Sequence, residues 1–170
     1  TNCILWDNNA AGSPSDLGFF SATYSCIGAG STAGEGNISI NPLFVSATDL
    51  RLQAGSPCRN TGTSDSSELP RFDMIGIART VDGFPDMGAY EYYPSNSIFV
   101  DRNYAGPYSG SITQPWPSLG PALLSYLDTN PRQIFVRGAN YPEGTPSQVF
   151  TINKAVTLHA WIAPPTIGRP

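Results

Sequence analysis

The first 52 residues contain short apolar runs, each of which ends in turn-forming residues. Each run has the length of a short strand, and Gly, Ser, Asn or Asp follows most of them. This pattern predicts short β-strands joined by tight turns. The runs cover residues 3–6, 22–27, 38–40, 43–45 and 50–52.

The triplet Asn2-Cys3-Ile4 recurs approximately 23 residues later as Ser25-Cys26-Ile27. That offset lies in the range of one coil of a repeating strand stack. Stacked coils bring equivalent residues to about 4.8 Å, within reach of a disulfide. Cys3 and Cys26 are therefore a candidate bonded pair. The alternative is that Cys3, Cys26 and Cys58 are three buried small hydrophobes without a bond, which we favour.

Residues 56–94 differ in composition from the preceding segment. Proline residues interrupt any regular strand there, at positions 57, 70, 85 and 94. Acidic residues are also frequent in this segment. We expect an irregular closing segment that covers the open edge of the preceding strands, with a last short strand at residues 86–92.

A second unit is expected after a boundary at residues 94–97. It begins with a strand at 98–101 and continues with a helix at 118–130, for which Ser118 can serve as the N-cap. The helical spacing of Leu119, Ala122, Leu123, Tyr126 and Leu127 predicts one apolar stripe. Strands are expected to follow at 133–137, 149–152 and 156–160.

Two groups of motifs resemble secreted or cell-surface right-handed parallel β-helix proteins of the pectin-lyase-like kind. Gly55-Ser56-Pro57-Cys58, followed by Asp86-Met87-Gly88-Ala89-Tyr90-Glu91, resembles the closing segment of that family. Residues 98–101, 110–111, 115–119, 134–136, 141–143 and 151–160 resemble its start. The chain would therefore run end first and beginning second.

The resemblance implies an all-β fold, a right-handed parallel β-helix or solenoid with one short capping α-helix near 118–130. Residues 1–94 would be the C-terminal coils and closing segment of one β-helix. Residues 95–170 would be the capping helix and first coils of a second. The expected interior side chains are Ile4, Trp6, Ile27, Phe44, Leu52, Val100, Phe135, Val136, Ile152 and Leu158.

Charge and composition exclude some classes of function. Charged residues make up only 13 % of the chain and the net charge is −4, so a nucleic-acid partner is not expected. No apolar run approaches the roughly 20 residues that span a bilayer. Because Thr1 is not an initiator Met, we expect a mature, processed or excised chain.

The chain offers little that is typical of catalysis. Lys154 is the only Lys and is expected in a plain turn, and His159 is expected on an outer strand position. Asp82, Asp86 and Glu91 form the densest acidic set, for which a solvated or backbone-capping role is favoured over glycoside hydrolysis. Trp6, Trp116 and Trp161 are expected to be stacked core residues rather than a sugar platform. Asn37-Ile38-Ser39 fits the N-glycosylation pattern but is expected to be a polar turn.

We therefore expect no enzyme, no catalytic, cofactor or metal site, and no cofactor. The expected function is a structural extracellular module that assembles end to end into a cell-surface fibre, filament or giant adhesin, and the resemblance implies a prokaryotic origin. Its partners would be copies of itself or adjacent modules, and surface polysaccharide is a further candidate. The alternatives are a fragment of a carbohydrate-active enzyme, a polysaccharide lyase or glycoside hydrolase, and a carbohydrate-binding surface module.

Overall fold

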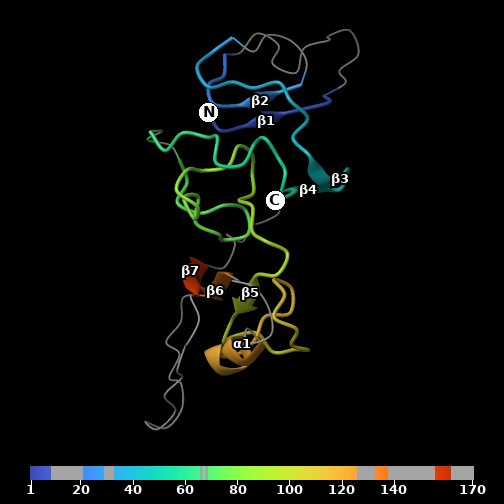
Figure 1. The fold of residues 1–170 in the computed structure, drawn as a ribbon, viewed down its shortest axis with the longest axis vertical. Coiled ribbons are helices and arrows are strands. Elements are labelled where there is room, and N and C mark those ends of the chain that lie inside the picture. The colour runs from blue at the N-terminus through green and yellow to red at the C-terminus, as the bar shows by residue number, and fades with distance from the viewer. Residues whose placement is uncertain are drawn as a thin grey trace, which may run out of the picture. The chain divides into compact units, whose positions relative to one another are not determined.

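The computed structural model describes residues 1–8, 21–28, 33–65, 67, 69–125, 133–137 and 156–161. The chain divides into two compact units, Thr1–Tyr92 and Tyr93–Pro170. The boundary expected from the sequence, at residues 94–97, lies close to this division. Each unit is described by itself (Figure 1).

Unit 1 begins with a two-stranded parallel sheet of β1 (Ile4–Leu5) and β2 (Cys26–Ile27). Ile4 pairs with Cys26 and Leu5 with Ile27, and an isolated parallel bridge joins Cys26 to Ile38. The two segments that the sequence repeat predicts to be neighbours do pair. Their register differs by one residue from the predicted one, which placed Cys3 beside Cys26.

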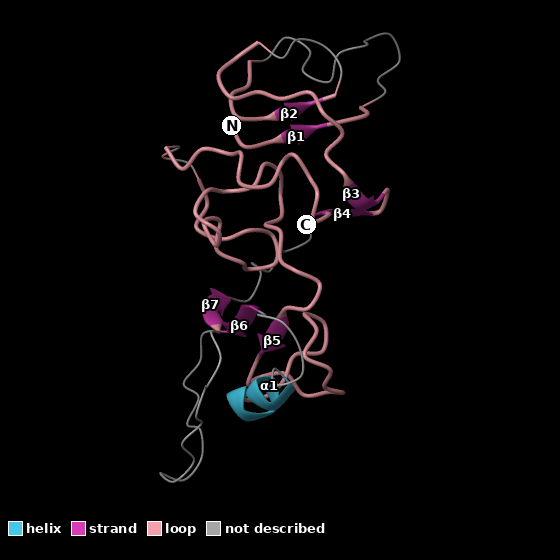
Figure 2. Cartoon of the chain, viewed as in Figure 1, coloured by secondary structure: helices cyan, strands magenta, loops and turns pink. Residues whose placement is uncertain are grey.

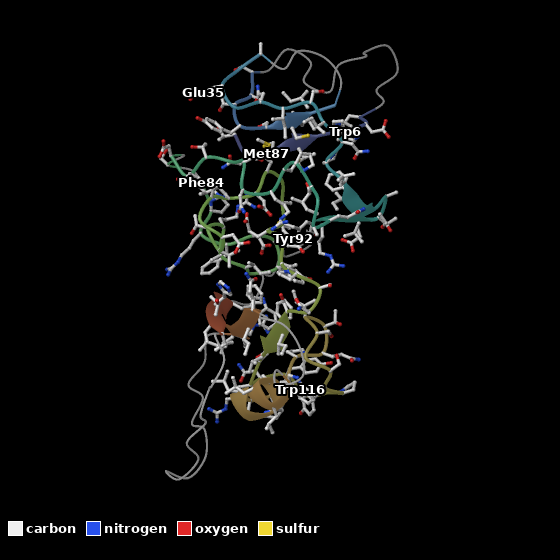
Figure 3. All side chains as sticks on the ribbon, in the orientation of Figure 1. Trp6, Glu35, Phe84, Met87, Tyr92 and Trp116 are labelled. Carbon is white, nitrogen blue, oxygen red and sulfur yellow. The ribbon has the colours of Figure 1, made fainter. Side chains whose placement is uncertain are left out.

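An antiparallel hairpin follows, made of β3 (Phe44–Ser46) and β4 (Asp49–Leu52). Phe44 pairs with Leu52 at the base of the hairpin, and both side chains belong to the hydrophobic core of unit 1. That core also contains Cys26, Cys58 and Met87, the last of which is labelled in Figure 3. Strands are absent from 53–92 among the described residues, where turns and bends take over.

Unit 2 contains a three-stranded parallel sheet in the order β5-β6-β7, with β5 at Ile98–Val100, β6 at Gln133–Arg137 and β7 at Thr157–Trp161. The helix α1 (Leu119–Ser125) lies within the expected range 118–130 and begins directly after Ser118. Its Ala122 is buried against Ile98, Val100 and Ile134 on one face of the sheet, as the apolar stripe requires. Residues 126–130 lie outside the described residues.

The opposite face of the sheet carries an aromatic ladder. Phe99, Phe135 and His159 occupy register positions on three adjacent strands. The rings of Phe99 and Phe135 stack at 5.0 Å, and His159 stacks on Phe135 at 5.0 Å. Tyr93 meets Phe99 edge-on at 5.2 Å, and Trp161 does so at 5.3 Å. Both faces of this sheet are therefore used for packing.

The expectation of a right-handed parallel β-helix is wrong for the described residues. Their strands are two to five residues long and form three separate small sheets, one of them antiparallel (Figure 2). A solenoid needs successive coils to extend the same parallel sheets, and an antiparallel hairpin such as β3–β4 interrupts that stacking. The Pro-rich and Gly-rich segments favour turns over strand extension.

The interior was predicted correctly at some positions and wrongly at others. Ile27, Leu52, Val100 and Phe135 are buried. The partly buried members of the set that pack against the two cores are Ile4, Trp6, Phe44 and Val136. Leu158 is 54 % exposed, whereas its neighbour His159, expected outside, is half-buried in the aromatic ladder. The predicted inward and outward positions of β7 are thus the reverse of those observed. Ile152 lies outside the described residues.

Within the described residues, no helix has the length and apolar character needed to cross a membrane.

Candidate functional site

The most concentrated polar chemistry of the described residues is a buried cluster in unit 1, which we call the acid–arginine cluster. It consists of Asp73, Arg79, Asp86 and Glu91, each 5 % exposed or less. An antiparallel bridge between Phe72 and Ala78 turns the chain so that Asp73 and Arg79 come from adjacent segments. Unpaired charges are rarely buried this deeply, so each of the four needs a structural reason.

Asp73 is the acceptor that holds this turn. Its Oδ1 accepts hydrogen bonds from the backbone N–H groups of Ile75 (2.9 Å) and Ile77 (2.7 Å). Its Oδ2 accepts one from the backbone of Glu91 at 2.9 Å. One carboxylate therefore replaces the main-chain partners that a strand would have supplied.

Asp86 and Glu91 hold a second loop together through hydrogen bonds to backbone N–H groups. Asp86 accepts the backbone N–H groups of Asn60 (2.7 Å) and Tyr92 (2.6 Å). The backbone N–H of Asp86 in turn lies 3.1 Å and 3.2 Å from the two carboxyl oxygens of Glu91. Asp86 thus joins the segment after Cys58 to the end of unit 1.

Arg79 is the cation at the centre of the cluster. Its Nη1 lies 2.9 Å from Oε1 of Glu91 and donates to the carbonyl of Gly88 at 3.0 Å. Its Nη2 donates to the carbonyl of Asp86 at 2.8 Å. The planar guanidinium therefore bridges one carboxyl group and two carbonyls of the same loop.

Burial raises the pKa of all three carboxyl groups. For Asp73 and Asp86, loss of water outweighs the stabilising backbone hydrogen bonds and the charge of Arg79. For Glu91, burial and then the charge of Asp86 raise the pKa to about 9. The charge of Arg79 acts to lower the pKa of Glu91. This effect does not outweigh burial and the charge of Asp86, because three carboxyl groups lie near one buried guanidinium. With this pKa, Glu91 is expected to hold a proton at neutral pH, so that its contact with Arg79 is a hydrogen bond from the guanidinium to a neutral carboxyl.

The N-terminal residues are tied to the same region through Asn2. Its side chain donates to the carbonyl of Thr63 and accepts from the backbone N–H of Thr63, both at 2.8 Å. Its backbone carbonyl accepts from Gly88 at 2.9 Å. Space is tight at Gly62, where a Cβ would lie 2.7 Å from the carbonyl of Pro85 and 2.8 Å from the Asn2 side chain. A side chain at position 62 would thus push these segments apart.

The arrangement is suited to holding the chain together rather than to turnover. A glycoside hydrolase needs two carboxyl groups that face a bound sugar. Here the carboxyl oxygens of Asp73, Asp86 and Glu91 accept main-chain N–H groups and are shielded from solvent. Among the described residues, no group of His, Cys, Asp and Glu is arranged to hold a metal ion. The prediction of a solvated or backbone-capping role agrees with the structure, in which Asp86 and Glu91 accept backbone N–H groups and Asp82 is exposed.

The other candidate residues are dispersed. Asn37 uses its whole amide: Nδ2 donates to the carbonyls of Ala22 and Ala33, each at 2.8 Å, and Oδ1 accepts from Ser25 at 3.0 Å. Its role is that of a structural turn residue. Lys154 lies outside the described residues.

The three Trp residues contribute mainly to packing. Trp6 packs on the unit 1 core and Trp116 on the unit 2 core. Trp161 is buried, and the guanidinium of Arg137 lies 4.7 Å from its ring centroid. The packing role predicted for these side chains is confirmed.

Sequence reasoning missed the parts played by Asn2, Asp73 and Arg79. The sequence indicated only that acidic residues are frequent in segment 56–94, and it singled out neither Asp73 nor Arg79. A usable signal was present, since Asp73 and Asp86 each come shortly before a Gly, a pattern typical of side-chain-stabilised turns. The pairing with Arg79 had no such local signal because it depends on where the turns place it.

No family model, no curated protein and no solved structure matches this chain. The resemblance to β-helix proteins therefore stays a prediction based on short motifs.

Proposed function

We propose that this protein is a structural extracellular module that joins copies of itself into a cell-surface assembly such as a fibre, filament or large adhesin. The observation that carries the proposal is that four large apolar side chains in or just before the β3–β4 hairpin are exposed. They are Ile40, Leu43, Val45 and Leu50, and we call this set the hairpin patch.

The hairpin patch is solvent-exposed while the base of the hairpin is fixed. Val45 is 48 % exposed and Leu50 is 51 % exposed, whereas Phe44 and Leu52 pack into the core of unit 1. Apolar side chains gathered on one exposed element mark a protein interaction surface more often than scattered ones do. A short exposed hairpin can also pair with an equivalent hairpin through its strand edges.

The buried carboxyl groups of unit 1 also favour a structural role, because they bind backbone groups of the same chain. The carboxyl groups that a hydrolase would need are occupied in the acid–arginine cluster, so a catalytic role for them is not favoured. The extracellular setting is supported by the motif resemblance alone.

The test is concentration-dependent assembly, followed by sedimentation velocity and negative-stain electron microscopy of the purified chain. Val45→Lys with Leu50→Lys is expected to leave the protein monomeric at concentrations where the unmodified chain assembles. Leu124→Lys is the matched control, because Leu124 is 66 % exposed and belongs to α1 in unit 2. A chain that stays monomeric at all concentrations would overturn the proposal, and equal assembly of the double variant would remove the hairpin patch from it.

A carbohydrate-binding role is the second candidate, and one observation favours it. Tyr108 is 45 % exposed, and its ring lies 6.3 Å from Trp116 in a stacked arrangement and 6.2 Å from Tyr104. Exposed aromatic rings provide flat apolar surfaces on which sugar rings can pack. This role predicts that the protein binds glycans and that Tyr108→Ala abolishes the binding. The control Phe84→Ala, which changes another exposed aromatic residue, is expected to leave the binding intact. A glycan array probed with all three proteins distinguishes the two candidates.

A further inference from the structure

Two of the three cysteines are brought together in the core of unit 1, although they are distant in sequence. Cys26 in β2 and Cys58 in the turn after Ser56-Pro57 are both fully buried in one hydrophobic cluster with Leu52 and Met87. The thiol of Cys26 donates to the carbonyl of Ile40 at 3.2 Å, and its sulfur accepts a hydrogen bond from the thiol of Cys58.

The strand register excludes the other obvious pair. Ile4, rather than Cys3, is the register partner of Cys26. Because neighbouring residues of a strand point to opposite faces, Ile4 shares the inner face with Cys26 while Cys3 points outward. Cys3 is accordingly exposed, and its thiol donates to the carbonyl of Thr1 at 3.2 Å.

We propose that Cys26 and Cys58 form a disulfide when the chain folds under oxidising conditions. The backbone N–H of Cys26 donates to the carbonyl of Cys3 at 2.9 Å, and the backbone N–H of Cys58 donates to the Ser56 hydroxyl at 3.1 Å. Because the two thiols are in hydrogen-bonding contact, their sulfur atoms are already neighbours, and a disulfide would bring them to about 2.0 Å.

The chemistry is thiol–disulfide exchange with a small-molecule or protein disulfide as oxidant. The Cys26 thiolate attacks one sulfur of the oxidant and releases one thiol, which takes up a proton. The Cys58 thiolate then attacks the mixed disulfide at the Cys26 sulfur and releases the second thiol. The two cysteines lose two protons and two electrons, and the oxidant is reduced to two thiols.

In the folded chain, the hydrogen bond from Cys58 lowers the pKa of the Cys26 thiol. During folding either thiolate can be the first nucleophile, and the exchange balances in the same way. Because both sulfurs are shielded from solvent, exchange takes place during folding, before the core closes. The bond would link β2 to the segment that follows β4, and it would therefore fix the base of the hairpin from two sides.

The test is refolding of the Cys3→Ser variant, which retains only Cys26 and Cys58, in mixed oxidised and reduced glutathione. Trypsin cleavage after Arg51 and Arg59 places the two cysteines in separate peptides. We expect these peptides to be linked, no free thiol in the denatured oxidised chain, and an unfolding midpoint raised by more than about 5 °C over the reduced chain.

The unmodified chain and Cys58→Ala complete the design. In the unmodified chain we expect the same Cys26–Cys58 link and one free thiol, and in Cys58→Ala no intramolecular bond. Two free thiols in oxidised, refolded Cys3→Ser would overturn the proposal. A Cys3–Cys26 link in the unmodified chain, found after chymotryptic cleavage at Trp6, would overturn it equally.

Discussion

At the scale of single residues, Glu91 is expected to make the stability of unit 1 depend on pH. It is 2 % exposed, and its pKa is raised to about 9 by burial and by the charge of Asp86, with a smaller contribution from Asp73. Arg79 acts in the opposite direction. A carboxyl group that is protonated in the folded chain and ionised in the unfolded chain makes stability fall as the pH rises.

Glu91→Gln is expected to remove this part of the pH dependence, because the amide resembles the protonated carboxyl. The proton contributes its full stabilisation below the unfolded pKa of 4.5, and this is lost as the pH rises through the folded value of about 9. The loss in the free energy of unfolding is at most about 1.4 kcal/mol per pH unit. Urea unfolding at several pH values between 5 and 9 measures it.

The exposed Asp82→Asn is the control for that series and is expected to keep the unmodified slope. Asp73 and Asp86, whose pKa values are also raised, contribute in the same direction and leave a residual slope in Glu91→Gln. Identical slopes for Glu91→Gln and the unmodified chain would contradict the assignment of the proton to Glu91.

Asn2 provides a second residue-scale prediction. It is buried, has a φ of 56° that Asn adopts more readily than most residues, and makes two 2.8 Å hydrogen bonds to Thr63. Asn2→Ala leaves the half-buried N–H and carbonyl of Thr63 without their side-chain partner, at a cost below the roughly 1–3 kcal/mol each that full burial would carry. Thermal unfolding should show a clear decrease, whereas the exposed Asn41→Ala should change stability by less than about 1 kcal/mol.

At the scale of elements, the central strand β6 is packed on both faces. Ile134 lies in the core beneath α1, and Phe135 is stacked between Phe99 and His159 on the other face. A strand buried on both faces reads in sequence as a continuous apolar run, as Ile134-Phe135-Val136 does. The edge strand β7 has no such run, which explains why its inside and outside positions were confused.

The ladder can be tested by paired truncations. Phe135→Ala is expected to destabilise unit 2 by about 3–5 kcal/mol, since a fully buried aromatic ring is removed. Leu158→Ala, in the adjacent strand but 54 % exposed, should change stability by no more than about 0.5 kcal/mol. Chemical unfolding followed by the fluorescence of Trp116 and Trp161 reports on this unit. Comparable costs at both positions would show that the side chains of β7 face the other way.

At the scale of the whole molecule, the chain consists of two compact units with different stabilising chemistry. Unit 1 depends on side-chain hydrogen bonds to the backbone and on the acid–arginine cluster, because its strands are short. Unit 2 depends on a parallel sheet that packs on a helix and on the aromatic ladder. Changes in the cluster should therefore affect unit 1 alone.

Arg79→Gln tests this independence. Removing the guanidinium leaves Asp73 and Asp86 buried without their cation and removes the hydrogen bonds that Arg79 donates to Glu91 and to the carbonyls of Asp86 and Gly88. Breaking such a buried cluster costs about 3–5 kcal/mol. Hydrogen exchange is expected to accelerate in the segment 56–92 and to stay unchanged in β5 and β6. Equal acceleration in both units would mean that they unfold as one.

The sequence by itself determined the local features of this protein. Most of the short strands, the position of the helix after Ser118 and the irregular segment from residue 56 follow from apolar spacing and from turn-forming residues, which act over a few positions. The backbone-capping role of Asp86 was accessible for the same reason. None of these features depends on distant contacts. The strand expected at 86–92 is not formed.

Only the tertiary structure decided how the strands combine and which side chains meet. The one-residue slip that pairs Ile4 with Cys26 selects Cys58 as the neighbour of Cys26, and the antiparallel β3–β4 hairpin interrupts the expected parallel stack. Arg79 finds Glu91 only because two turns, held by Asp73 and Asp86, bring them together. Register, strand direction and charge partners depend on the free energy of long-range packing, and short sequence motifs do not specify it.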